Sequence, residues 1–209
     1  KGLSFAKDVK RLQKGEHIDY VIGFVDFLGC RIDLSKRPLI PRPETEYWVE
    51  KAIQEVQKSN NCKENVPVAC LDMFSGSGCI GIAVLKRVPN AIVDFAEKNK
   101  KFCNQIAINA KLNGIDSKRY HIVQSDIFSG LKGRKYDYIF VNPPYLAELK
   151  KHKVQASVLK HEPREALFAG KDGLDIICLF LGWAKDFLTP WGKIYLEFDS
   201  PQKREIAGL

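Results

Sequence analysis

The rhythm of hydrophobic and polar positions changes near residue 66. Between residues 44 and 58, Trp48, Ala52, Ile53 and Val56 recur on one helical face and predict an amphipathic helix. From residue 66 onward, short apolar runs of strand type alternate with helical patterns. We expect strands at residues 66–73, 91–96, 121–124, 136–141 and 193–198, and helices at residues 79–88, 100–112 and 174–188.

This alternation of strands and helices favours an α/β fold. Strands separated by helices form a mostly parallel central sheet with helices on both faces. In such sheets, ligands bind at the carboxyl ends of the strands. The chemistry is therefore expected in the loops that directly follow the strands.

The first 43 residues have a different pattern. Residues 7–14 read as the end of a helix, and residues 21–27 and 30–34 predict a small β-hairpin around Leu28-Gly29. Prolines at positions 38, 41 and 43 exclude a regular element there. We expect residues 1–43 to be a remnant of an N-terminal domain with a linking hairpin, and residues 44–209 to form the main domain.

Composition and charge narrow the class of protein. Hydrophobic residues make up 45% of the 209 positions and charged residues 28%, which excludes a disordered or fibrous chain. The net charge of +8 favours anionic or nucleic-acid-associated partners. The longest strictly apolar run, residues 176–184, is shorter than the roughly 20 residues of a membrane-spanning helix, and no secretory signal is visible. A cytoplasmic location is expected, with the mitochondrial matrix as the alternative.

The six cysteines suggest neither a metal site nor a disulfide framework. None is part of a Cys-x-x-Cys pair, and the four histidines do not cluster beside them. We therefore expect no bound metal. The cysteines stand at positions 30, 62, 70, 79, 103 and 178.

A glycine-rich loop follows the first predicted strand of the main domain. Gly76 and Gly78 let the backbone turn tightly and approach a ligand, and the next helix points its amide groups to the same place. Gly76-x-Gly78-x-x-Gly81 also matches the dinucleotide fingerprint, with Glu97 at a suitable distance for a ribose, so an NAD-dependent oxidoreductase is a rival reading. The candidate ligand-binding residues here are Asp72, Phe74, Ser75, Gly76, Ser77 and Gly78.

Acidic residues near the ends of the strands are candidates for polar contacts with a ligand. Asp72 ends an apolar strand, where a buried carboxylate needs a partner such as a ligand amine, or else braces the loop. Glu97 is preferred over Asp94 for a ribose. Asp126 could accept from an adenine amino group, and Ile127 could pack on the base, although a loop aspartate is more often a turn or capping residue.

The strongest motif is Asn142-Pro143-Pro144-Tyr145, directly after the strand at residues 136–141. Two prolines remove two backbone donors and leave acceptors, namely the Asn142 side-chain oxygen and the Pro143 carbonyl. Tyr145 adds a flat face. This combination suits a planar NH2 group, whose nitrogen would be aimed at an electrophile in the neighbouring site. Asn142, Pro143 and Tyr145 are therefore the catalytic candidates.

At this point the sequence resembles the class I S-adenosylmethionine methyltransferases, a Rossmann-like fold. More narrowly, it is similar to the release-factor glutamine N5-methyltransferase family (PrmC/HemK). Two of the segments that carry the resemblance, residues 40–46 and 162–167, are specific to the glutamine enzymes, whereas Asn-Pro-Pro-Tyr is shared with adenine-N6 methyltransferases. The segments are residues 20–23, 27–29, 39–46, 72–78, 142–145, 162–167 and 170–175.

The resemblance implies a cofactor, a substrate and a pocket. The cofactor would be S-adenosyl-L-methionine, contacted by the glycine loop, Glu97, Asp126, Ile127 and Asn142. The substrate would be the glutamine of the Gly-Gly-Gln motif in peptide-chain release factors. Its pocket would be lined by Phe27 and the segment from residue 42 to 46. The substrate-binding candidates are Phe27, Arg42, Pro43, Glu44, Asn142, Pro143, Pro144 and Tyr145.

The chain departs from the family pattern in several places. Phe74 stands where the family usually has glycine. Most of the N-terminal helical domain and the last antiparallel strands are expected to be missing. A nucleic-acid amino (adenine-N6 type) methyltransferase and a non-catalytic binding module remain alternatives, and the protein is expected to be a monomer without a membrane partner.

Overall fold

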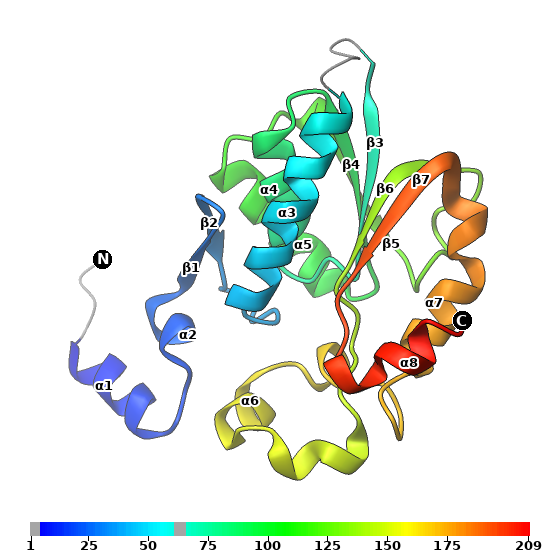
Figure 1. Cartoon of the computed structure of the whole chain (residues 1–209). Helices are drawn as coiled ribbons and strands as arrows, with labels where there is room; N and C mark the ends of the chain where they lie inside the picture. Colours follow the sequence, from blue (N-terminus) through cyan, green and yellow to red (C-terminus); the bar gives the residue numbers. More distant parts are fainter. Residues whose placement is uncertain (1–4, 61–65) are drawn as a thin grey trace.

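A five-stranded parallel sheet forms the centre of the computed structural model, which describes residues 5–60 and 66–209. The strand order is β5-β4-β3-β6-β7, and every neighbouring pair is parallel (Figure 1). The predicted α/β fold is therefore confirmed. The strands are β3 (Val68–Met73), β4 (Ala91–Glu97), β5 (Tyr120–Gln124), β6 (Tyr136–Val141) and β7 (Leu188–Leu196).

Helices cover both faces of this sheet, as the alternation of apolar runs predicts. On one face, Cys70 and Phe140 pack in a core with α3, α4 and α5. On the other face, Leu71 and Ile139 pack against Phe180 of α7. Successive strand residues thus point into opposite cores, which is why the strands read as continuous apolar runs. The helices are α3 (Pro43–Asn60), α4 (Cys79–Arg87), α5 (Lys100–Leu112) and α7 (Asp175–Ala184).

The N-terminal segment consists of two helices and a hairpin. Helices α1 (Phe5–Gln13) and α2 (Ile18–Ile22) precede antiparallel strands β1 (Phe24–Phe27) and β2 (Cys30–Asp33). The predicted turn is confirmed, since Leu28 and Gly29 both have positive φ, 49° and 79°. The predicted start of the first strand at residue 21 is wrong, because α2 continues to Ile22 and ends at Gly23 with φ of 93°.

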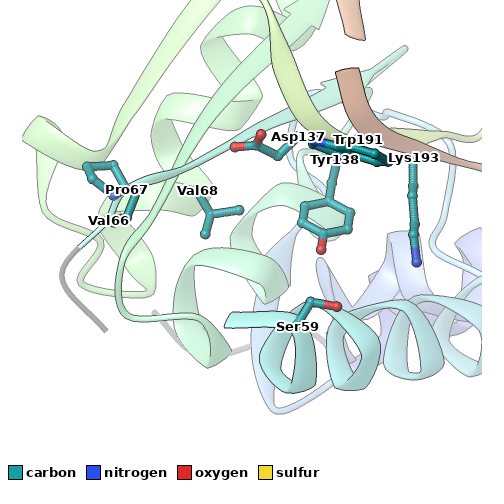
Figure 2. Close-up of a pocket in the computed structure, with 8 residues that line it drawn as sticks. All are labelled: Ser59, Val66, Pro67, Val68, Asp137, Tyr138, Trp191 and Lys193. Atoms are coloured by element: carbon teal, nitrogen blue, oxygen red, sulfur yellow. The ribbon is translucent and has the colours of Figure 1, made fainter. Parts of the chain in front are cut away.

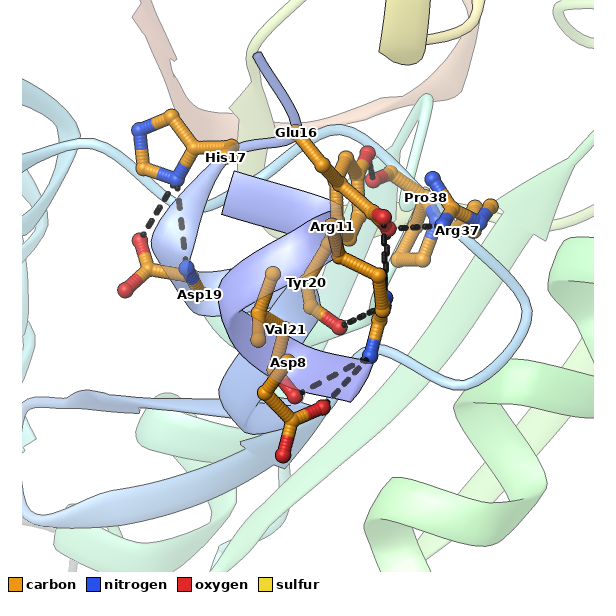
Figure 3. A network of polar contacts seen from close by, with 9 residues as sticks. All are labelled: Asp8, Arg11, Glu16, His17, Asp19, Tyr20, Val21, Arg37 and Pro38. Atoms are coloured by element: carbon orange, nitrogen blue, oxygen red, sulfur yellow. Dashed lines mark hydrogen bonds and ion pairs between the residues drawn. The ribbon is translucent and has the colours of Figure 1, made fainter. Parts of the chain in front are cut away.

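A partly buried polar network holds this segment against the proline-rich stretch (Figure 3). Arg11 donates two hydrogen bonds to the Glu16 carboxylate, at 2.7 and 2.9 Å, and Arg37 forms an ion pair with the same carboxylate. The Tyr20 hydroxyl donates to the Pro38 carbonyl at 2.6 Å. Because residues 38–42 run from here toward the loops at the sheet edge, the network fixes one side of the candidate site.

The C-terminal third differs most from the predicted elements. Helix α7 ends at Ala184, and β7 begins at Leu188, five residues before the expected start at 193. Two short helices, α6 (Ala156–His161) and α8 (Lys203–Ile206), were not predicted, because each is too short to show a helical period. No helix in the described ranges is long and apolar enough to cross a membrane.

The described cysteines are all free thiols. Cys30, Cys70, Cys79 and Cys103 are buried, and Cys178 is exposed. Cys62 lies outside the described residues.

Candidate active site

The carboxyl ends of four parallel strands bring the predicted loops to one edge of the sheet. Met73, the last residue of β3, pairs with Val141, the last residue of β6. The glycine loop and the Asn142 loop therefore leave neighbouring strands side by side. Glu97 ends β4 on the other side of β3, and the loop with Asp126 and Ile127 follows β5.

The glycine loop turns through three left-handed residues. Phe74, Gly76 and Gly78 have φ of 58°, 52° and 77°. Ser75 fixes the loop, because its hydroxyl donates to the Asp72 carbonyl at 2.6 Å and its backbone N–H donates to the Ala96 carbonyl at 3.2 Å. Helix α4 begins directly after Gly78, so its N-terminal amide groups face this turn.

Two further residues of this region pack tightly against the protein. Ser77 is 3% exposed, and its carbonyl accepts from the Asn109 side chain at 2.9 Å. A Cβ atom on Gly81 would lie 2.3 Å from the Phe95 ring, so only glycine lets α4 sit this close to β4. Ser77 and Gly81 therefore hold the loop and helix in place.

Asp72 is a buried carboxylate with one oxygen satisfied. Its Oδ2 accepts the Gly81 N–H at 2.9 Å, whereas its Oδ1 has no hydrogen-bond partner among the described residues. Burial, with a smaller effect from the nearby Glu97, raises the pKa of Asp72 from 3.8 to about 8. One oxygen of the carboxyl group thus binds the start of α4, and the other is a buried acceptor without a donor among the described residues.

Glu97 is 8% exposed and holds two loops by their backbones. Its Oε2 accepts the Gly76 N–H at 2.9 Å, and its Oε1 accepts the Asn99 N–H at 2.7 Å. Burial raises the pKa of Glu97, and these two hydrogen bonds act in the opposite direction. Each carboxylate oxygen retains a lone pair, so further hydroxyl donors can bind there.

Asp126 and Ile127 lie in the loop after β5. The exposed Asp126 carboxylate forms an ion pair with Lys98, which follows Glu97, at 2.7 Å. Ile127 has φ of 51°, and its carbonyl accepts from the Ser125 hydroxyl at 2.5 Å. Asp94, the less favoured candidate for the ribose, lies in the middle of β4. Its carboxylate accepts a hydrogen bond from the Tyr136 hydroxyl at 2.7 Å and contacts His121 Nδ1 at 2.9 Å.

The Asn142 loop lines a cavity of about 140 Å³. Pro143 and Pro144 are buried, and the Tyr145 hydroxyl donates to Glu197 Oε1 at 2.9 Å. Burial and the adjacent Glu197 raise the pKa of Tyr145, so the phenol stays protonated. The cavity is lined by Leu39, Arg42, Asn142, Pro143, Tyr145, Leu146, Val158, Ala166, Leu167 and Glu197.

The sequence does not identify Glu197 as a site residue, and it indicates Thr45 only within the segment 42–46. The Glu197 carboxylate follows β7 and accepts from the Thr45 hydroxyl at 2.7 Å. The Asn142 side-chain nitrogen donates in turn to Thr45 Oγ1 at 3.2 Å. No local motif marks Glu197, but its position just after the last strand of the sheet is the same signal that marks Glu97.

The predicted substrate-binding residues divide into two groups. Arg42 lines the cavity and forms an ion pair with Glu162, whose other oxygen accepts the Ile40 N–H at 3.2 Å. Pro43 and Glu44 are exposed at the start of α3. Phe27 does not line this cavity, because its side chain is 1% exposed and packs in the core beneath the hairpin.

A larger cavity of about 340 Å³ lies away from these loops (Figure 2). It is found near the amino ends of β3 and β6, where Val68, Asp137 and Tyr138 face it. None of the predicted site residues lines it. Ligands of parallel sheets bind at the opposite edge, so the smaller cavity beside Asn142 is the candidate active site.

Comparison with known proteins identifies the family. Residues 59–173 match the family described as "Methyltransferase small domain". The chain is 36% identical to the release factor glutamine methyltransferase of Streptococcus pneumoniae, over 98% of this chain and 70% of that protein. It is 33% identical to a bifunctional methyltransferase of Rickettsia conorii, over 99% of this chain but only 43% of that protein.

A solved structure confirms the fold. The methyltransferase from Pyrococcus furiosus superposes with a TM-score of 0.58 at 18% identity, over 97% of this chain and 84% of that one. The predicted Rossmann-like methyltransferase fold is thus confirmed. The sequence identities, taken with the methyltransferase domain match, show that this chain belongs to the release factor glutamine methyltransferase family of S-adenosylmethionine-dependent enzymes.

Proposed function

We propose that this protein transfers the methyl group of S-adenosylmethionine to the side-chain amide nitrogen (N5) of the glutamine in the Gly-Gly-Gln motif of a peptide-chain release factor. One observation carries the proposal. The Asn142 side-chain nitrogen is engaged by Thr45, which leaves its carboxamide oxygen and the Pro143 carbonyl as acceptors beside a cavity. Among the described residues, neither acceptor receives a hydrogen bond.

The residues at the sheet edge fit the proposed cofactor. The unmatched Oδ1 of Asp72 is a suitable partner for an ammonium group, since a buried carboxylate is stabilised by a cation. Glu97 offers free lone pairs for ribose hydroxyls, and the left-handed turn at Gly76 and Gly78 keeps side chains away from the ligand. Asp126 and Ile127 are assigned to the adenine by their place after β5. When bound, the cofactor supplies an electrophilic methyl group on a sulfonium.

The Asn142 loop supplies the catalytic effect. An amide nitrogen is a poor nucleophile, because its lone pair is delocalised into the carbonyl. Acceptors that bind both of its hydrogens orient the nitrogen and stabilise the positive charge that develops as the new C–N bond forms. The proton leaves after transfer, so no strong general base is required. Tyr145 shapes the slot, and Pro144 keeps the loop rigid.

The remaining predicted contacts describe how the substrate glutamine would enter. We assign Arg42 to the cavity wall, where Glu162 holds its guanidinium. Pro43 and Glu44, exposed at the start of α3, are placed where a flanking part of the release factor would pass. Phe27 has no place in this proposal, because it is buried in the core.

The alternative of nucleic-acid amino methylation is not favoured. Asn-Pro-Pro-Tyr suits an exocyclic amine as well as an amide. However, three relatives of which this chain covers more than two thirds are named release factor glutamine methyltransferases. The rival reading as an NAD-dependent oxidoreductase leaves the Asn142 loop without a role.

Labelled S-adenosylmethionine tests the proposal directly. The protein is offered a recombinant release factor, the same factor with its Gly-Gly-Gln glutamine changed to alanine, and a pool of DNA and RNA. We expect label on the unmodified factor alone. Label on nucleic acid, or equal label on both factors, would contradict the proposed substrate. Mass spectrometry of the tryptic peptide then identifies N5-methylglutamine.

A further inference from the structure

The Glu197 carboxylate collects three side-chain donors from two distant parts of the chain. Thr45 Oγ1 and Trp48 Nε1 both lie 2.7 Å from its Oε2, and the Tyr145 hydroxyl lies 2.9 Å from its Oε1. Its own backbone N–H donates to the Val141 carbonyl at 2.9 Å, which ties it to the residue before Asn142. The carboxylate is therefore fixed relative to the catalytic loop.

The direction of each hydrogen bond in this network follows from the chemistry of the groups. An indole N–H can only donate, so Glu197 Oε2 is an acceptor. The one hydroxyl proton of Thr45 then points at Oε2 and leaves only lone pairs toward Asn142. The group of Asn142 that faces Thr45 must be the NH2, and the carboxamide oxygen is turned to the other side. A flipped Asn142 would place two acceptors 3.2 Å apart.

We propose that Thr45 and Glu197 are positioning residues that set the substrate specificity of the site. They keep Asn142 in the orientation that offers an acceptor, so the site recognises an NH2 group and rejects an oxygen at the same position. This inference rests on the proposed function. It explains how the site would distinguish glutamine from glutamate, which the proposed function alone does not. The Pro143 carbonyl and the Glu197 charge act in the same direction, because both repel a carboxylate.

A mere structural brace would give a different result from a positioning pair. If Thr45 and Glu197 only pinned α3 to the sheet, their loss would lower the melting temperature without changing which substrate is preferred. If they orient Asn142, their loss lets the carboxamide flip. The flip lowers kcat on the glutamine substrate and allows the site to bind glutamate more tightly. A site whose donors and acceptors pair with those of the substrate strongly rejects analogues that cannot form the same hydrogen bonds. This discrimination is lost when the pairing is lost.

The test uses the full chain with the variants Thr45→Val and Thr45→Ser. Valine keeps the shape and removes both hydrogen bonds, whereas serine keeps the hydroxyl. The substrate is the release factor, and the inhibitor is the same factor with its Gly-Gly-Gln glutamine changed to glutamate. We measure kcat, KM, the inhibition constant of the glutamate factor, and S-adenosylmethionine affinity by calorimetry.

We expect roughly a tenfold lower kcat for Thr45→Val, the effect of about one lost orienting hydrogen bond. The glutamate factor should bind this variant several-fold more tightly relative to the glutamine factor, with cofactor affinity unchanged. Thr45→Ser should restore both values. In the Asn142→Ala background, Thr45→Val should have no further effect on kcat, because no carboxamide is left to orient.

Two outcomes would overturn the inference. One is a folded Thr45→Val enzyme with wild-type discrimination. The other is an additive loss of kcat in the double variant. If Thr45→Val fails to fold, Thr45→Ala gives the same test, since it also removes the hydroxyl that accepts from Asn142; unchanged discrimination there has the same meaning. Failure of the wild-type protein to methylate the release factor would instead contradict the proposed function.

Discussion

The hydroxyl oxygen of Thr45 lies 3.2 Å from the side-chain nitrogen of Asn142, although 97 positions separate the two residues in the chain. Thr45 belongs to the first turn of α3, before the sheet begins, and its other partner, Glu197, follows the last strand. Both lie outside residues 59–173, which match the methyltransferase domain family. The Asn142 loop is thus held from two segments that flank the matched domain.

Replacing Asn142 by alanine should affect the chemical step and not the cofactor. We expect Asn142→Ala to lower kcat by roughly 10²–10³-fold, because an acceptor that stabilises the transition state is removed. S-adenosylmethionine affinity, measured by calorimetry, should change by less than about threefold, since most proposed cofactor contacts lie at the ends of β3 and β4 and in the loops after β3 and β5. Asn104→Ala, at an exposed position of α5, is the matched control. Near-normal turnover of a folded Asn142→Ala enzyme would remove Asn142 from the mechanism.

The affinity for S-adenosylmethionine should depend on pH through Asp72. Burial raises the pKa of Asp72 to about 8, so the ligand-free protein holds a proton there at neutral pH. A bound ammonium group favours the carboxylate, so binding releases this proton. Affinity should therefore rise by up to about tenfold per pH unit below pH 8 and level off above it. Calorimetry in buffers of different ionisation enthalpy measures the proton release.

Asp72→Asn provides the control for this pH dependence, because it removes the titrating group and keeps the shape. The slope of affinity against pH should disappear in this variant. Stability gives a second readout: between pH 4 and pH 8 the folded wild type binds a proton that the unfolded chain does not. Its free energy of unfolding should therefore fall as pH rises through that window, and less so in Asp72→Asn. Equal slopes in the two proteins would contradict the raised pKa.

The sheet and its loops could be predicted from the sequence because their signals are local. Apolar runs mark β3 and β6, the glycine loop that ends at Gly78 follows β3, and Asn142 directly follows β6. The early start of β7, at Leu188, could not be found in this way. Its first residues include Pro190 and Gly192, two residue types that are depleted in strands, and its pairing with β6 is irregular between Tyr136 and Tyr138.

The contacts that complete the site were hidden for a different reason. Glu197 and Thr45 meet only because β7 lies next to β6 and the first turn of α3 lies beside the carboxyl end of β7. No spacing in the sequence encodes such a contact. The placement of Phe27 shows the converse, since a residue in a segment that carries the family resemblance packs in the core and does not line the cavity.

The left-handed conformation of Phe74 should make glycine more stable than alanine at this position. Phe74 has φ of 58°, where a side chain with a Cβ atom is strained, and its ring packs edge-on against Phe180 at 6.4 Å. Both Phe74→Ala and Phe74→Gly lose the ring contact, but only glycine relieves the backbone. We expect the free energy of unfolding of Phe74→Gly, measured by urea denaturation, to be about 1 kcal/mol higher than that of Phe74→Ala. The reverse order would contradict a strained backbone at Phe74.

The Glu16 network should make stability sensitive to acid. Hydrogen bonds from Arg11 and Arg37 lower the pKa of Glu16 from 4.5 to about 2. The stability that Glu16 contributes is therefore fully present above about pH 4.5 and is lost as pH falls toward 2. We expect Glu16→Gln to lower the free energy of unfolding by about 1–2 kcal/mol at pH 7, a value reduced by the partial exposure of both arginines. The difference from wild type should shrink as the pH is lowered from 4.5.

Asp26→Asn is the matched control for this variant. Asp26 is also on the N-terminal segment, but its side chain is 73% exposed and lies 4.0 Å from Arg31, so its removal should change stability by less than about 0.5 kcal/mol. Because the Glu16 network holds residues 37 and 38 beside the start of the Arg42 segment, Glu16→Gln should also raise KM for the release factor while leaving cofactor affinity unchanged. A stability loss equal to that of Asp26→Asn, or one that persists unchanged at pH 2.5, would show that Glu16 does not anchor this segment.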